Sequence, residues 1–341
     1  MNIPRLLLAT WLTAGAAVPA AAQTADALVA SHSQLEFHSA FLMNLHHSLY
    51  AAAWARRPEA GTLRALAGPL PSSLEAPMTE DEQAAWNAAI DYYDAHLASR
   101  DLLFGRGMRD LKIALVAGDL AGAAVGRDLR KVLESVSPVY RKHFWPAHDQ
   151  ANRAWIRQTV EGVRAIAQEV TARLTRLYAM PWFTSPVRID VVWVGNRQGA
   201  YATDGPTHAT ISSGASNNTG WSAVEIVFHE ISHTLIAPIE KQLAATLGDR
   251  LREHGVLWHV VQFYVTGQVV RDVLESRGVS YSPYMYSTGL FDRAWSRYRP
   301  AVERNWRPYV DGEVTMQQAV EGTVKQLPGV KDAAGSGDAG E

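Results

Sequence analysis

The chain of 341 residues contains no cysteine. This absence excludes disulfide bonds, a thiol nucleophile and zinc sites with thiolate ligands, so any metal ion must be held by histidine and carboxylate side chains. No run of about 18 apolar residues follows the N-terminal segment, so we expect no membrane-spanning helix. The formal net charge is only −2, and no basic patch interleaved with aromatic residues is present. The sequence therefore gives no indication of a nucleic-acid-binding surface.

The first residues have the order of a secretory signal peptide. Arg5 precedes an apolar stretch, and small residues lead to Ala20-Ala21-Ala22. The stretch is short for a membrane anchor and ends in an Ala-x-Ala pattern, which is typical of a cleavage site. We therefore expect residues 1–22 to be removed and the mature protein to be exported, either to the periplasm or to the medium.

The region 23–185 has the pattern of a helical unit. Thr79 and Glu82 are spaced as a capping box, in which the hydroxyl and the carboxylate each accept a backbone N–H at the start of a helix. This helix is expected to continue to about Ser99. Apolar residues at helical spacing predict further helices over 34–57, 107–117, 120–136 and 146–178. We expect this region to be all α.

The character of the sequence changes after residue 186. Short β-branched runs bounded by Gly and Pro predict strands over 188–194, 200–203 and 208–213. Helices are expected again from Pro238 to about His254 and from Val256 to Arg277. The sequence thus predicts an α+β fold that is mainly helical, with a small sheet and the candidate site within 186–327. The Gly-, Ala- and Asp-rich residues 328–341 are expected to be disordered.

The apolar segment VEIVFHEISHTLI contains an HExxH motif, His229-Glu230-Ile231-Ser232-His233. On a helix, residues four apart lie on one face, so His229 and His233 can both direct a ring nitrogen at one metal ion. Glu230 is close enough to polarise a water bound to that ion, which is the layout of a zinc hydrolase. The alternative is two histidines that are simply packed in a helical core.

Strands followed by an HExxH helix and a second helix resemble the zincin metallopeptidases. Ile231, Ser232, Thr234 and Leu235 fit the uncharged and hydrophobic positions of the broader zincin pattern. Ile236 and Ile239 stand where the metzincin branch has Gly and a third His, which favours the gluzincin side and its third ligand on a downstream helix. The segments NLHHSLY, LWHVVQFYVTG and YSPYMY also resemble uncharacterised exported bacterial HExxH proteins. The resemblance implies a zincin-like catalytic core, bound zinc and a peptide substrate.

Two residues compete as the third metal ligand. Glu253 lies 20 residues after His233, a spacing similar to that of thermolysin-like enzymes, but its charged surroundings also suit a surface carboxylate. His259 lies among apolar residues, and burying an imidazole costs free energy unless something binds it. We predict His259 as the ligand and keep Glu253 as the alternative.

Five further residues are candidates for the surroundings of the metal. Glu225 could accept a hydrogen bond from a ligand histidine, or could lie at the surface. One of His46 and His47 could reach the cleft, but adjacent helical residues diverge by about 100° and cannot both face one point. Tyr284 could direct its phenol at a developing oxyanion, or could pack in the core. His208 begins the strand predicted nearest the HExxH helix, and the zincin resemblance implies that a peptide substrate lies along 208–213.

These observations favour an exported zinc-dependent hydrolase that acts on peptide or other amide bonds. Glu230 would take a proton from the bound water and pass it to the leaving amine. A zinc hydrolase acting on another kind of bond would use the same residues. A third possibility is a catalytically inactive protein on the same fold that serves in binding or as a scaffold.

Overall fold

The computed structural model describes residues 27–58, 77–103, 105–116, 118, 120, 124–203, 205 and 207–328. The predicted signal peptide and all but the first residue of the predicted C-terminal tail lie outside these ranges. The described chain is predominantly helical and contains one small mixed sheet, as the sequence predicts. Among the described residues, no helix combines the length and the apolar character needed to cross a bilayer.

Helices outnumber strands along the described chain. In chain order the elements are β1 Leu28–His32, β2 Leu35–His38, α2 Phe41–Ala55, α4 Glu80–His96, α5 Arg106–Leu115, α6 Arg127–His143, α7 Trp145–Tyr178, β3 Val187–Val192, β4 Ala200–Thr203, β5 His208–Ser212, α8 Gly220–Ser232, α9 Ala237–Leu247, the 3₁₀ helix η3 Gly248–Arg252, α10 Leu257–Glu275, α11 Tyr284–Ser287, α12 Leu290–Ala294, the 3₁₀ helix η4 Ser296–Tyr298, α13 Arg299–Asp311 and α14 Met316–Gln326.

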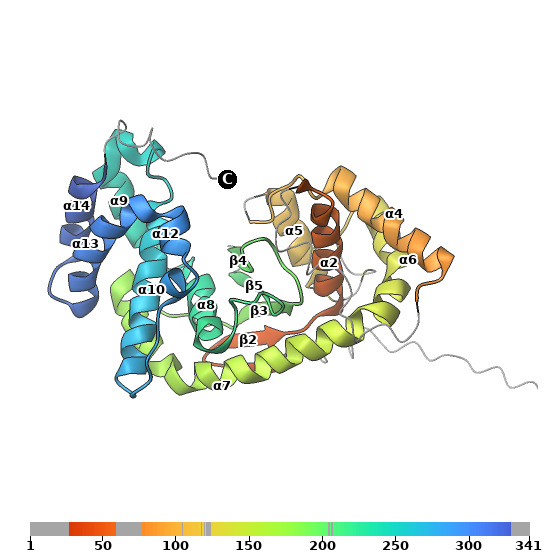
Figure 1. The fold of residues 1–341 in the computed structure, drawn as a ribbon, viewed down its shortest axis with the longest axis horizontal. Coiled ribbons are helices and arrows are strands. Elements are labelled where there is room, and N and C mark those ends of the chain that lie inside the picture. The colour runs from red at the N-terminus through yellow and green to blue at the C-terminus, as the bar shows by residue number, and fades with distance from the viewer. Residues whose placement is uncertain are drawn as a thin grey trace, which may run out of the picture.

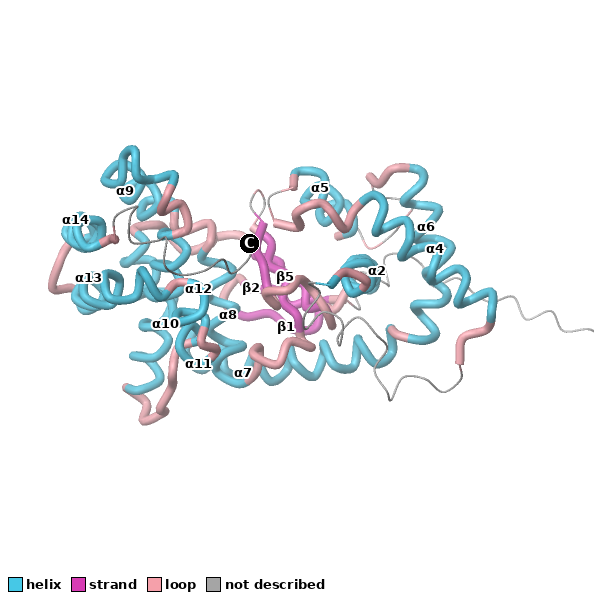
Figure 2. The backbone as a smooth tube through the Cα atoms, turned by 45° about the horizontal axis from the view of Figure 1, so that its top comes forward, coloured by secondary structure: helices cyan, strands magenta, loops and turns pink. Residues whose placement is uncertain are grey.

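The sheet lies at the centre of the molecule and has five strands in the order β1-β2-β3-β5-β4 (Figure 2). The three inner strands are parallel to one another, whereas β1 and β4 run antiparallel to their neighbours. All five residues of β5 are buried. The candidate site helix α8 contacts β4 and β5, so this end of the sheet supports the HExxH motif.

Two strands come from the region that the sequence predicts to be all helical, and that prediction is wrong. The helix expected over 34–57 begins only at Phe41, because residues 35–38 form β2. Leu35 and Phe37 are fully buried and lie opposite Val187 and Ile189 of β3. A run of four residues is too short to separate a strand from a helix by its apolar spacing. Pairing with β3, about 150 residues away, decides the conformation.

Helix α7 joins two helical halves that flank the sheet (Figure 1). This helix has 34 residues and runs below the sheet from one half to the other. On one side, α2, α4, α5 and α6 enclose one hydrophobic core. On the other side, α8, α10 and the C-terminal helices form a larger core together with the sheet and most of α7. The HExxH motif belongs to the larger core.

Candidate metal centre

Helix α8 carries the HExxH motif at its C-terminal end. The ten residues 223–232 are all buried, because the sheet covers one side of the helix while α7 and α10 cover the other. A helix that is hydrophobic all round is expected in such a position. His229 lies in the last turn and His233 is the C-terminal capping residue, so both imidazoles project from the same end of the helix.

Three histidines converge at this end of α8. One nitrogen from each of His229, His233 and His259 lies within 4.8 Å of the others, and the Nε2 atoms of His229 and His259 are 3.3 Å apart. Zinc–nitrogen bonds of about 2.0–2.1 Å in a tetrahedral arrangement require nitrogens about 3.3–3.4 Å apart. The cluster could therefore hold a metal ion, and the predicted third member, His259, is confirmed as part of it.

The alternative ligand Glu253 is not part of this cluster. It follows the 3₁₀ helix η3, and its Oε2 lies 3.9 Å from Nε2 of His254. Its side chain is about one-third exposed. Helix α10, which carries His259, starts only at Leu257, after the turn that leaves Glu253 outside the cluster.

Gln262 links the two helices that carry the histidine cluster. It is fully buried on α10, one helical turn after His259. Its Nε2 donates to the carbonyl oxygen of His229 at 2.9 Å and to Oγ of Ser232 at 3.0 Å. The Tyr178 hydroxyl of α7 donates to the backbone carbonyl oxygen of Gln262. This chain of hydrogen bonds ties α7, α10 and α8 together behind the histidines.

Burial keeps the three imidazoles neutral. Desolvation lowers the pKa of His233 to about 4 and that of His259 to about 3, and it lowers the pKa of His229 well below its ordinary value. A neutral imidazole offers the nitrogen lone pair that a metal ion needs, whereas a protonated one does not. At neutral pH the cluster is therefore in the protonation state that binds metal.

Glu230 lies beside the cluster with a carboxylate oxygen that has no hydrogen-bond partner among the described residues. The residue is 4% exposed, and its Oε2 is 3.7 Å from Nε2 of His233. Burial raises the pKa of Glu230 to about 8. A buried carboxylate without partners is costly, and a nearby cation would compensate that cost. This unpartnered oxygen is the second observation, after the histidine geometry, that fits a metal ion at this position.

Aromatic rings surround the histidines. The ring of Phe263 stacks on His229 with centroids 3.6 Å apart. Trp258 meets His233 edge-on at 5.6 Å, and Trp295 meets His259 edge-on at 5.5 Å. Both tryptophans and both of these histidines are only partly buried. The cluster therefore has one side that reaches solvent between two indole rings, as a site with an open coordination position requires.

Glu225 makes its hydrogen bonds to tyrosines, and no hydrogen bond joins it to a histidine of the cluster among the described residues. Its Oε2 accepts the Tyr281 hydroxyl at 2.7 Å and the backbone N–H of Tyr284 at 3.0 Å. Helix α8 is buried from all sides, so this carboxylate faces the segment after α10 rather than solvent. It holds the segment 281–284 against α8. The ring of Tyr284 stacks on Phe263 at 6.1 Å, which places it in the aromatic layer behind His229.

The remaining predicted histidines lie outside the cluster. Nδ1 of His46 is 3.0 Å from the Tyr93 hydroxyl, and both rings are buried in the smaller core. His47 lies between the carbonyl oxygen of Met43 and the hydroxyl of Tyr201. His208 contacts the buried carboxylate of Asp190 at 2.5 Å. His46, His47 and His208 are therefore hydrogen-bonded core residues, and neither His46 nor His47 belongs to the cluster.

The segment 208–213 cannot pair with an extended substrate. It forms β5, which is hydrogen-bonded to β3 on one side and to β4 on the other. The free edge near α8 belongs to β4. Apolar patterns identify strands but not their order in a sheet, so the sequence could not distinguish the inner strand from the edge strand.

Several groups that support the site were not predicted from the sequence. Gln262 and Phe263 follow His259 by three and four residues, so their place on its helical face was a usable signal. No sequence signal indicated Trp295, because only the tertiary fold brings it next to the cluster. Lys112 was also missed. Its buried ammonium group donates to the His208 carbonyl oxygen at 2.8 Å from the far side of the sheet.

No protein-family model, curated protein or solved structure matches this chain. The function of the cluster therefore has to follow from the residues that form it.

Proposed function

We propose that this protein is an exported zinc-dependent hydrolase of the zincin type that cleaves peptide or other amide bonds. The observation that carries the proposal is the convergence of three neutral imidazoles from α8 and α10 beside the unpartnered carboxylate oxygen of Glu230. Histidine donors without thiolates suit zinc in a catalytic site. The predicted signal peptide supports export.

His229, His233 and His259 would hold the zinc ion, which supplies a Lewis acid and lowers the pKa of a water molecule. Glu230 accepts a proton from the attacking water and delivers it to the leaving amine. Burial raises the pKa of Glu230, and a metal ion beside it would lower that pKa again, so that the carboxylate could accept a proton.

The open side of the cluster favours an uncharged group of the substrate next to the scissile bond. Trp258 and Trp295 border this side, and the ring of Phe263 contacts that of Trp295. Aromatic surfaces bind apolar side chains by burying their area. A peptide or amide with an apolar residue at this position therefore fits better than an acidic or basic one.

Metal analysis of three variants tests the proposal. We expect about one zinc ion per chain in the wild-type protein, loss of the ion in His229→Ala, and retention in Glu230→Gln. Glu230→Gln should also lower kcat on a cleaved peptide by about a hundredfold to ten-thousandfold, because the proton acceptor is removed. His96→Ala, which changes an exposed histidine outside the cluster, is the matched control. Full activity of Glu230→Gln would contradict the mechanism.

The two alternatives give different results in the same experiment. An inactive binding or scaffold protein binds no metal after zinc supplementation, or binds it without cleaving any member of a broad peptide library. A zinc hydrolase acting on another bond would also leave the peptides intact, but it would show a Glu230-dependent activity on esters or non-peptide amides. The intact cluster favours the catalytic proposal over the scaffold.

A further inference from the structure

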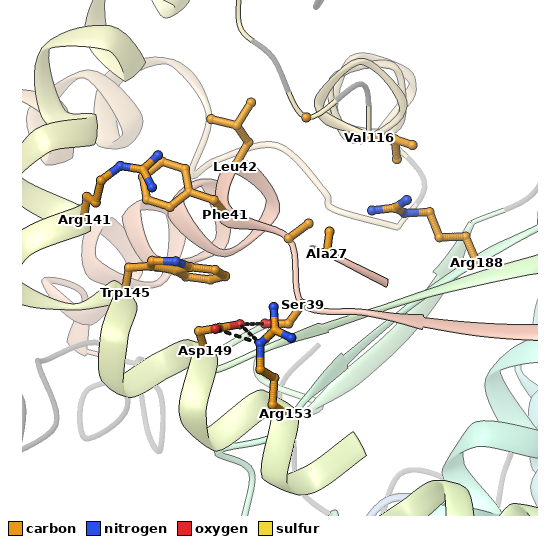
Figure 3. Close-up of a pocket in the computed structure, with 12 residues that line it drawn as sticks. Ala27, Ser39, Phe41, Leu42, Val116, Arg141, Trp145, Asp149, Arg153 and Arg188 are labelled. Atoms are coloured by element: carbon orange, nitrogen blue, oxygen red, sulfur yellow. Dashed lines mark hydrogen bonds and ion pairs between the residues drawn. The ribbon is translucent and has the colours of Figure 1, made fainter. Parts of the chain in front are cut away.

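A cavity lies away from the histidine cluster, at the junction of β2 and α2 (Figure 3). It has a volume of about 200 Å³. Twelve residues from five segments line it: Ala27, Ser39, Ala40, Phe41, Leu42, Val116, Gly118, Arg141, Trp145, Asp149, Arg153 and Arg188. None of them belongs to the histidine cluster or contacts it. The proposed hydrolase function leaves this cavity unexplained.

The charge of the lining is positive. The lining contains three arginines, Arg141, Arg153 and Arg188, and one carboxylate, Asp149. Asp149 is already engaged, because it accepts both the Ser39 hydroxyl at 2.7 Å and Nε of Arg153 at 2.8 Å. Arg188 binds the buried Asp190 through Nε and Nη2, which leaves its Nη1 outside that ion pair. Arg153 and Arg188 are thus each paired with a carboxylate, and the remaining positive charge of the cavity comes from Arg141.

Arg141 is the least constrained of the three arginines. It comes from the last turn of α6, and its guanidinium group stacks on the ring of Phe41 at 4.0 Å. No ion pair or hydrogen bond to it occurs within the described part of the chain. In Figure 3 it lies on the side of the cavity opposite Arg188. An anion between them could receive charge-assisted hydrogen bonds from both sides.

Helix α2 adds backbone donors to the same cavity. Its first residues, Phe41 and Leu42, belong to the lining, and Ala40 at the N-cap offers no side-chain acceptor. The first N–H groups of a helix have no intrahelical partner, and the helix dipole favours an anion at this end. No acidic side chain is present in the first turn of α2. These donors reinforce the arginines.

We propose that this cavity binds a small organic oxyanion, a carboxylate or a phosphate monoester that carries a flat apolar body. Arg141, Nη1 of Arg188 and the start of α2 would hold the charged group. Phe41 and Trp145 would contact the apolar body. A volume of about 200 Å³ lies below the range of about 300–1,000 Å³ typical of sites for drug-sized ligands, so the ligand is a small one.

Calorimetric titration with three probes tests this site. Benzoate and phenyl phosphate carry the two anionic groups, and benzamide is the uncharged counterpart of benzoate. We expect at least one anion to bind at least tenfold more tightly than benzamide and to bind more weakly as salt is raised, because salt screens the charges. The stronger of the two anions identifies the preferred group. Equal binding of benzoate and benzamide, together with no binding of phenyl phosphate, would overturn the proposal.

Two variants locate the binding. Arg141→Gln should weaken binding of the anion about tenfold to hundredfold, the loss expected for a hydrogen bond to a charged group. Arg141 is exposed and makes no ion pair with a described residue, so the variant should fold normally. Arg157→Gln, which changes an exposed arginine of α7 outside the lining, should leave affinity unchanged. Equal affinity of the wild-type and Arg141→Gln proteins would place the anion elsewhere and refute the assignment.

Discussion

If the histidine cluster binds zinc as proposed, replacing Gln262 by Met should weaken zinc binding much more than it weakens the fold. Gln262 does not touch the side chain of any ligand histidine. It donates to the backbone of His229 at 2.9 Å and to Ser232 at 3.0 Å, and so sets how closely α10 approaches α8. Met has a similar length and no branch, so it fills the space without making these hydrogen bonds.

The magnitude follows from the contacts. Two hydrogen bonds contribute about 1–3 kcal/mol together. Ser232 still donates to the His229 carbonyl oxygen at 2.8 Å, so that oxygen keeps a partner. The variant also removes Oε1 of Gln262, which is buried without a partner among the described residues, and this offsets part of the loss. We expect a net fall of about 1 kcal/mol in the free energy of unfolding and a fall of about tenfold to hundredfold in zinc affinity.

Two measurements check this prediction. Urea unfolding of the metal-free protein gives the change in stability, and competition with a chromophoric chelator gives the zinc affinity. Gln168→Met, an exposed position on α7, is the control and should change neither quantity. A Gln262→Met protein with unchanged zinc affinity would refute the positioning role of this residue, whatever its stability.

Three further predictions concern stability. Burial raises the pKa of Glu225 to about 7, so the folded metal-free protein binds more protons than the unfolded chain between about pH 4.5 and 7. Its free energy of unfolding should fall as pH rises through that window, and Glu225 should account for at most about 3 kcal/mol of the fall. Urea titrations at several pH values should therefore show a smaller fall in Glu225→Gln. An equal fall in both proteins would contradict this assignment. Gly267→Ala should lower the free energy of unfolding by about 1–3 kcal/mol, because the added Cβ would lie 2.9 Å from Cβ of Pro283 and 3.0 Å from Oε1 of Glu225. Urea unfolding measures this change. An unchanged free energy of unfolding would show that the segment after α10 can move away from the added methyl group. Thr79→Ala should lower the free energy of unfolding by about 1 kcal/mol, because it removes the N-cap of α4. Thr79→Ser should lower it much less in the same assay.

Local patterns predicted much of the helical structure. The capping box at Thr79 is present, with both of its hydrogen bonds formed. The helix expected over 146–178 occurs as α7, within one residue at its start. These features depend on neighbouring residues only. The helix expected over 120–136 instead occurs as Arg127–His143 and contains Pro138 in its interior, so helix boundaries were less predictable than helix existence.

The pairing of strands far apart in the chain could not be predicted from the sequence. The strands 28–32 and 35–38 gain their hydrogen bonds from each other and from β3, far along the chain. The order of β5 and β4 could not be predicted either. The segment 208–213 was expected at the edge of the sheet, but the edge strand is β4, residues 200–203. Strand order depends on which apolar faces meet in three dimensions, and no short-range period encodes that.

The sequence by itself determined the chemistry available to this protein. The chain has no cysteine, and His229 and His233 lie one helical turn apart with Glu230 between them in the sequence. A metal site formed by this motif can therefore use only imidazole and carboxylate groups. The tertiary structure decided which residue completes it. His259 joins the cluster and Glu253 does not, because α10 packs against α8 with its first turn facing the histidines. That choice depends on the approach of two helices held by buried hydrogen bonds, which spacing along the chain does not specify.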